Sequence, residues 1–97
     1  MVSSKAYFAI PVSEKESVYV DLYDTRYVLN FGWQKHRGRG FQDGYVSLQD
    51  HFYACLRHLW KWFLLKTKDP ETGASHLHHA HARILMMIYQ EQQLNDD

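Results

Sequence analysis

Imidazole and carboxylate groups are concentrated in the second half of this 97-residue sequence. Five of its seven histidines fall in two places: His58, and then His76, His78, His79 and His81. Asp69 and Glu71 lie between these two places. Imidazole nitrogens and carboxylate oxygens are ligands that proteins use for Zn²⁺ and Mn²⁺. The pattern therefore predicts a divalent metal site with His76, His79 and Asp69 as ligands.

The same region admits two other interpretations. Basic side chains beside a helix N-terminus can hold a phosphate group, and the candidates for that role are Arg57, His58, Lys66, Lys35 and Arg37. The histidines can instead form a structural network of hydrogen bonds, because neither H-x-x-x-H nor H-E-x-x-H occurs. The basic loop around residues 36–44, with three glycines, can likewise be a solvated surface loop.

Two long helices must position these residues. Apolar side chains recur at helical spacing after Ser47, a predicted N-cap, and predict a helix over 48–66. Ser75 is the predicted N-cap of a second helix over 76–93. The Asp69–Gly73 connector is short and has turn residues, so we expect an antiparallel helical hairpin. Its predicted core is Phe52, Leu56, Leu59 and Phe63 against Leu77, Ala80, Ile84 and Ile88.

The N-terminal part is predicted to be different in kind. Val18, Val20 and Leu22 alternate with polar or aromatic positions, which indicates short β-strands or an extended arm over 1–23. A third, short helix is expected to begin at Asp24 or Thr25 as N-cap and to end near Gly32 or His36. The fold class is thus mainly α, with a short extended or β arm.

Composition limits the kind of protein. Hydrophobic residues make up 45% and charged residues 23%, which is typical of one globular domain over 1–97, with a helical core over 24–93 and a frayed tail at 94–97. Cys55 is the single cysteine, so no intrachain disulfide is possible. No apolar run reaches the length of a membrane span, and no signal peptide is evident. We therefore expect a cytoplasmic protein that does not contact membranes.

Charge and aromatic content indicate partners. The formal net charge is zero, which argues against a non-specific DNA-binding protein, although residues 26–68 have an excess of six positive charges. That basic middle suits an anionic ligand such as a nucleotide. Trp60 and Trp62 widen the apolar face of the helix over 48–66 beyond what one partner helix covers, which predicts a homo-oligomer or a protein partner.

Several strings resemble the phage-type dATP/dGTP diphosphohydrolase-like domain. The residues that carry the resemblance are Phe31-Gly32, Lys35-His36, Arg57-His58-Leu59 with Trp62, and Asp69-Pro70-Glu71-Thr72-Gly73-x-Ser75-His76-Leu77-x-His79-Ala80. The resemblance covers roughly residues 22–92. It implies a mainly helical, often oligomeric domain linked to cleavage of purine deoxynucleoside triphosphates to monophosphate and pyrophosphate. It also implies Mg²⁺, Mn²⁺ or Zn²⁺ as cofactor and Asp69 and Glu71 as catalytic carboxylates.

One departure keeps a second function open. All-α nucleotide pyrophosphohydrolases bind Mg²⁺ through carboxylates spaced E-x-x-E and E-x-x-D, and neither spacing occurs here. The metal would have to rely on Asp69, Glu71 and histidines. The alternative is a small phage-encoded protein that binds and inhibits a host nuclease or defence complex without catalysis.

Overall fold

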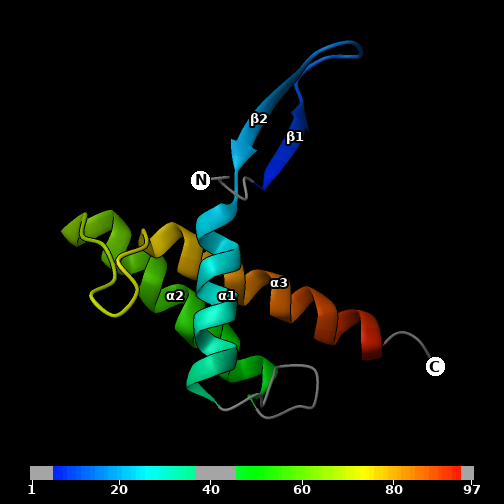
Figure 1. The fold of residues 1–97 in the computed structure, drawn as a ribbon. Coiled ribbons are helices and arrows are strands. Elements are labelled where there is room, and N and C mark those ends of the chain that lie inside the picture. The colour runs from blue at the N-terminus through cyan, green and yellow to red at the C-terminus, as the bar shows by residue number, and fades with distance from the viewer. Residues whose placement is uncertain (1–5, 37–45, 95–97) are drawn as a thin grey trace.

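The computed structural model describes residues 6–36 and 46–94. Five elements follow one another along these residues: β1 (Tyr7–Pro11), β2 (Ser17–Asp21), α1 (Tyr23–Lys35), α2 (Leu48–Leu65) and α3 (His76–Leu94). Figure 1 shows a helical body with a β-hairpin that projects from it. The expectation of a mainly α fold with a short N-terminal β arm is confirmed.

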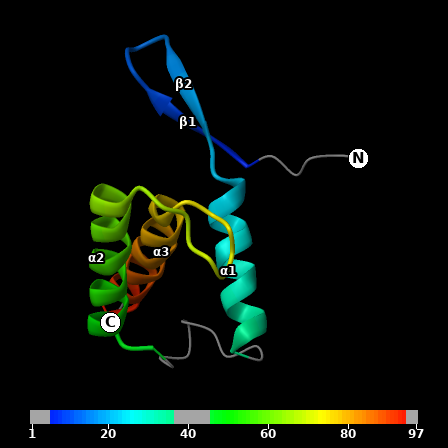
Figure 2. The ribbon, with the colours of Figure 1, turned by 90° about the vertical axis from the view of Figure 1, so that its left-hand side faces the viewer.

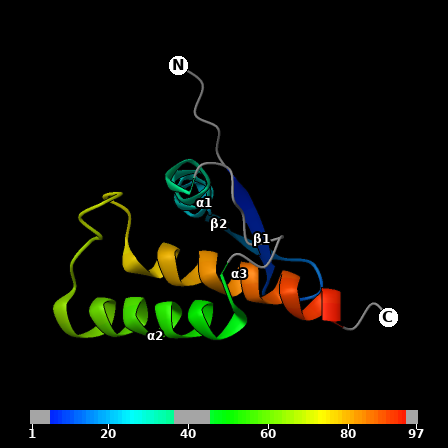
Figure 3. The same cartoon turned by 90° about the horizontal axis from the view of Figure 1, so that it is seen from below.

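Helices α2 and α3 form the antiparallel pair that the sequence predicts (Figure 3). Their bounds agree with the predicted ones to within one residue at each end. The Ser47 hydroxyl oxygen accepts a hydrogen bond from the backbone N–H of Asp50 at 3.1 Å, as a predicted N-cap should. Helix α2 ends at Lys66, whose φ of 54° turns the chain out of the helix.

Helix α1 lies on the opposite side of α3 from α2 (Figure 2) and crosses the pair rather than running along it (Figure 3). The predicted N-cap, Asp24 or Thr25, is wrong, because the helix already begins at Tyr23. Asp21, at the end of β2, accepts a hydrogen bond from the backbone N–H of Tyr23 at 2.9 Å and so fills the role from outside the helix. Thr25 is instead buried, at 2% exposure.

Strands β1 and β2 form a two-stranded antiparallel sheet in which Tyr7 pairs with Asp21 and Pro11 with Ser17. Every residue of both strands is exposed. The hairpin therefore stands clear of the helical body, as Figure 1 shows. Isolated hairpins are only marginally stable in water.

The predicted core is largely wrong. Phe52, Leu56, Leu59 and Phe63 are 37% to 62% exposed, and of the predicted α3 stripe only Ala80 is buried. The buried apolar residues are all small: Ala54, Cys55, Ala74, Ala80 and Ala82. Helix α2 turns its small and histidine-bearing face toward α3, so its large apolar side chains face outward. The largest fully buried side chains are accordingly His51, His76 and Thr25.

Three predictions fall outside the residues that the structure describes. They are the phosphate-binding role of Arg37, the loop over 36–44 beyond His36, and the frayed tail beyond Leu94. Within the described residues, no helix is both long enough and apolar enough to cross a membrane.

Candidate functional site

The connector between α2 and α3 fixes the position of Asp69. One of its carboxylate oxygens, Oδ1, accepts hydrogen bonds from the backbone N–H groups of Glu71 and Thr72 at 2.8 and 3.2 Å. Gly73 donates its N–H to the Asp69 carbonyl at 2.7 Å and has a φ of 75°, a conformation that glycine adopts without strain. The turn residues predicted from the sequence therefore orient the Asp69 carboxylate through backbone hydrogen bonds.

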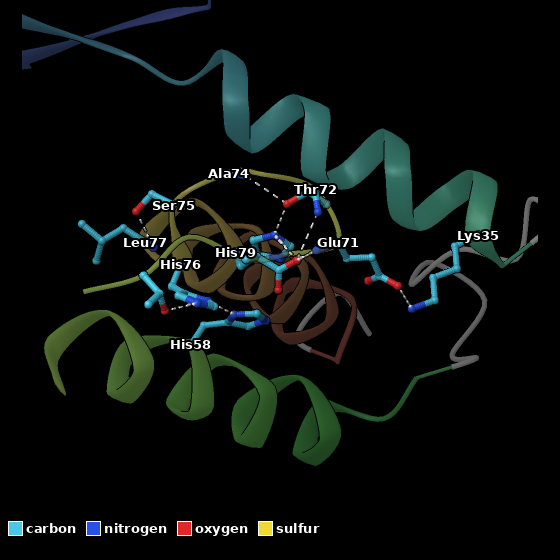
Figure 4. A network of polar contacts seen from close by, with 11 residues as sticks. Lys35, His58, Glu71, Thr72, Ala74, Ser75, His76, Leu77 and His79 are labelled. Atoms are coloured by element: carbon cyan, nitrogen blue, oxygen red, sulfur yellow. Dashed lines mark hydrogen bonds and ion pairs between the residues drawn. The ribbon is translucent and has the colours of Figure 1, made fainter. Parts of the chain in front are cut away.

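Three histidines from the facing helices meet beside this connector (Figure 4). The rings of His58 and His79 are stacked, with centroids 4.5 Å apart. Nδ1 of His58 lies 2.9 Å from Nδ1 of His76. Nε2 of His79 lies 2.6 Å from the Thr72 hydroxyl and 3.7 Å from Oδ1 of Asp69. The helical hairpin thus gathers His58, His76, His79 and Asp69 at one end.

One set of these residues has the spacing of metal ligands. His58, Asp69 and His79 each offer a ligand atom, and the three atoms lie within 4.8 Å of one another. Asp69 and His79 are two of the predicted ligands. The third predicted ligand, His76, is 1% exposed and lies behind His58, which was predicted to bind phosphate instead.

The contact between His58 and His76 restricts their tautomers. Only one of the two Nδ1 atoms can carry the hydrogen, because a hydrogen bond needs one donor and one acceptor. A metal on Nε2 of His58 requires that His58 donate from Nδ1 and His76 accept. His76 can then donate from Nε2 to the Thr67 hydroxyl, 3.4 Å away. Such a partner behind a ligating histidine is what metal sites usually contain.

Burial favours the neutral forms of His58 and His79. Burial and the neighbouring His79 and His76 lower the pKa of His58 to about 4. Burial also lowers the pKa of His79, although the nearby Asp69 carboxylate opposes this shift. For Asp69, burial alone would raise the pKa, but backbone hydrogen bonds and the two histidines outweigh it and hold the pKa below its ordinary value. Neutral imidazoles beside an ionised carboxylate are the protonation states that bind a metal.

A cleft of about 650 Å³ adjoins this cluster. Helix α1 forms one wall, and His58, Asp69, Glu71 and His79 lie in the other. Lys35 at the end of α1 pairs with Glu71 across the cleft at 2.8 Å (Figure 4). The volume lies within the range of small-molecule sites.

The structure separates the predicted phosphate-binding residues. Lys35 and His58 line the cleft. Arg57 is exposed and lies instead in a shallow apolar groove on the outer side of α2, beside Trp60. Lys66 is exposed at the end of α2 and does not line the cleft.

Two residues of the cleft wall were given no site role from the sequence, although Arg83 was expected on the same face of its helix as His76 and His79. His51 is fully buried, and its Nδ1 lies 3.0 Å from a guanidinium nitrogen of Arg83. Both residues line the cleft. Helical spacing contained the signal, since His51 lies seven residues before His58 and Arg83 four residues after His79, on the same helix faces.

A second group of histidines joins α1 to α3. The buried hydroxyl of Thr25 lies 2.8 Å from Nδ1 of His78 and 3.0 Å from Nδ1 of His81. This group supports the structural-network interpretation for two of the five clustered histidines. It holds the helix that forms the cleft wall.

The family comparison agrees with the resemblance found in the sequence. A family model described as dATP/dGTP diphosphohydrolase, N-terminal, matches residues 21–97. The matched range contains all three helices and the whole histidine cluster, and it leaves out β1. No match is found among curated proteins or among solved structures.

Proposed function

The chain belongs to the dATP/dGTP diphosphohydrolase N-terminal family, and on that premise we propose that it hydrolyses purine deoxynucleoside triphosphates to monophosphate and pyrophosphate. The observation that carries the proposal is the group of His58, Asp69 and His79, which could hold a metal in the wall of a cleft large enough for a nucleotide. In the reaction, water attacks the α-phosphorus. The bond between the α-phosphorus and the oxygen that bridges it to the β-phosphorus breaks, and pyrophosphate leaves.

The donor set suits some metals better than others. Mg²⁺ prefers oxygen ligands. Imidazole suits transition metals such as Zn²⁺, and Mn²⁺ accepts a mixture of nitrogen and oxygen ligands. Two imidazoles and one carboxylate therefore favour Mn²⁺ or Zn²⁺ over Mg²⁺. Such an ion would supply a water of lowered pKa and polarise the phosphoryl oxygen.

The chain's own residues have separate roles in this proposal. Asp69, already oriented by two backbone N–H groups, provides the anionic ligand. Glu71 lines the cleft and accepts a proton from the attacking water. Lys35 holds Glu71 in place and is positioned to contact a phosphate when the nucleotide enters. His76 orients His58 from behind.

Pyrophosphate release from each of the four deoxynucleoside triphosphates, with Mn²⁺, Zn²⁺ or Mg²⁺, tests the proposal. We expect turnover of dATP and dGTP above about 0.01 per second with Mn²⁺ or Zn²⁺, since ordinary enzymes turn over at about 1 per second or faster. Asp69→Asn should abolish it, whereas Asp24→Asn, an exposed carboxylate in the first turn of α1 that does not line the cleft, should not. Equal background rates for the wild type and Asp69→Asn would refute the hydrolytic role.

A second candidate function is favoured by the exposed surfaces. The β-hairpin and the outer face of α2 both present large apolar side chains that no described residue covers. A protein that binds and inhibits a host nuclease or defence complex would use such surfaces. Two results would favour this role. The protein would bind nucleotides without releasing pyrophosphate, and variants with substitutions in the cleft would inhibit the host protein as well as the wild type does.

A further inference from the structure

The guanidinium of Arg83 lies in the cleft wall, where the Asp50 carboxylate compensates its charge only in part. Arg83 is partly buried, and within the described residues it makes no ion pair. Burial and the nearby Arg57 lower its pKa from the ordinary value for arginine. Arginine nonetheless keeps its charge in proteins. A partly buried positive charge with no described carboxylate at ion-pair distance is unfavourable, and an anion in the cleft would relieve it.

His51 determines where this guanidinium points. Arginine has only donors, so Nδ1 of His51 must be the acceptor in their 3.0 Å contact. The hydrogen of the neutral ring is then on Nε2, which is buried and has no partner among the described residues. A buried unpaired donor costs stability. The contribution of His51 is therefore the orientation of Arg83 and not the stability of the core.

The position of Arg83 relative to the metal-capable group limits what it can contact. Arg83 follows His79 by four residues on α3, so it lies one turn, about 6 Å, further along the same helix. On the opposite wall, formed by α1, Lys35 is already paired with Glu71, and Arg26 lies near the other end of that helix. An extended polyanion that begins at the metal-capable group would reach Arg83 next.

We infer that Arg83 binds the terminal phosphates of the nucleoside triphosphate and that His51 is its positioning residue. This inference rests on the proposed function for the identity of the ligand. Guanidinium groups bind phosphate oxygens through two parallel hydrogen bonds, and this geometry requires a fixed orientation. Arg83 thus takes the phosphate-binding role that the sequence suggested for Arg57.

Calorimetric titration with inorganic pyrophosphate, in Mn²⁺ and in EDTA, tests the subsite without requiring hydrolysis. Arg83→Gln should weaken pyrophosphate binding about tenfold or more, as expected for a lost charge-assisted hydrogen bond. Lys15→Gln removes a positive charge from the exposed turn of the hairpin, which does not line the cleft, and is the control. Deoxyguanosine monophosphate lacks the terminal phosphates, so its affinity should be equal in the wild type and Arg83→Gln.

His51 variants test the positioning role. His51→Gln keeps an acceptor for Arg83 and should preserve pyrophosphate binding, whereas His51→Phe should weaken it as Arg83→Gln does. Circular dichroism identifies variants that do not fold. For the wild type, the imidazole ¹⁵N spectrum should show His51 as the Nε2–H tautomer whether or not its variants fold, and any other tautomer would overturn the assignment.

Failure of the subsite and failure of the proposed function are distinguishable. Pyrophosphate binding that depends on Arg83 without any hydrolysis would leave the subsite standing and remove the enzyme. Hydrolysis with pyrophosphate affinity and KM unchanged in Arg83→Gln would remove the subsite alone. Equal weakening of monophosphate binding would also overturn the inference, because Arg83 would then contact another part of the nucleotide.

Discussion

His76 is the most buried histidine of the cluster and, at 1% exposure, is as buried as His51 outside it. It does not line the cleft. Its contacts run to His58 on one side and to Thr67 on the other. We therefore expect it to act through His58, by accepting the hydrogen that frees the other ring nitrogen for a metal. Its effect on metal binding should be indirect and graded.

Replacement of His76 by phenylalanine tests this role. His76→Phe keeps a ring in the space but removes the acceptor, so we expect metal affinity to fall by about 10- to 100-fold, as for other partners of ligating histidines. His79→Phe removes a ligand and should abolish binding. Titration calorimetry with Zn²⁺ and Mn²⁺ measures both. Metal affinity unchanged in His76→Phe would show that His58 is not a ligand through Nε2.

The lowered histidine pKa values predict how stability depends on pH. The unfolded chain takes up protons near the ordinary histidine pKa of about 6.5, whereas the folded protein keeps His58 neutral down to about 4. The pKa values of His51, His79 and His81 are also lowered, in each case mainly by burial. Below pH 6.5 the unfolded state therefore binds more protons, so the free energy of unfolding falls as the pH falls toward 4.

Thermal melts at pH 7.5, 6.5, 5.5 and 4.5 measure this dependence. The melting temperature should fall slightly between pH 7.5 and 6.5, where the unfolded histidines become half protonated, and more steeply at each lower step. A melting temperature that rises as the pH falls from 6.5 would contradict the neutral cluster.

The residue types of the site could be predicted from the sequence, but their individual roles could not. Asp69 and His79 were expected in the metal site because a short turn and a helix start place them together. The group that could hold a metal contains His58 where the sequence suggested His76, since membership depends on which ring faces the cleft and which lies behind it. Sequence spacing assigns a helix face but not the depth of a side chain below the surface.

Among the elements, α1 is held by an unusual contact. The Thr25 hydroxyl has one hydrogen, yet it lies within hydrogen-bond distance of His78 and His81 on α3. It can donate to one ring and accept from the other, so a single side chain satisfies both. This buried junction fixes the wall of the cleft that carries Lys35.

Thr25→Val should loosen that junction. Valine keeps the shape but leaves two ring nitrogens without a partner, so we expect a loss of about 1–3 kcal/mol in the free energy of unfolding. Thr25→Ser, which keeps the hydroxyl, is the control and should be less destabilising. Urea denaturation measures both. Equal stability of the wild type and Thr25→Val would mean that α1 does not depend on the hydroxyl.

The bounds of α2 and α3 could be predicted almost to the residue, because caps and turn residues mark their ends. The orientation of α2 could not. Its apolar side chains at helical spacing indicated a face toward α3, but the structure packs Ala54 and Cys55 there. Periodicity identifies an amphipathic helix without saying whether its apolar face covers its own chain or another.

At the scale of the whole molecule, the small size of the buried side chains limits how much stability the core can provide. Five small apolar residues form the described core, while Trp60 and Phe63 on the outer face of α2 are 64% and 62% exposed. A chain of this length gains little stability from such a core, and association is a common remedy. The homo-oligomer indicated by the sequence stays a prediction, and α2 is the surface we expect to mediate it.

Sedimentation of the wild type and Trp60→Glu at tens of micromolar tests that surface. The wild type should sediment as a dimer or a larger species, with a melting temperature that rises with protein concentration. Trp60→Glu should shift it toward the monomer, whereas Tyr19→Glu in β2 should not. A monomeric wild type across this range would leave the face of α2 to another partner.

One further property follows from how the hairpin joins the body. Only Leu22 separates β2 from α1, and its N–H is bonded to the carbonyl of Ala6 beside β1 at 2.7 Å. Because this joint is short and hydrogen-bonded, we expect the hairpin to move together with α1, which forms one wall of the cleft. A molecule that bound the hairpin would therefore restrain α1 as well. Binding outside the cleft would in this way affect the width of the cleft.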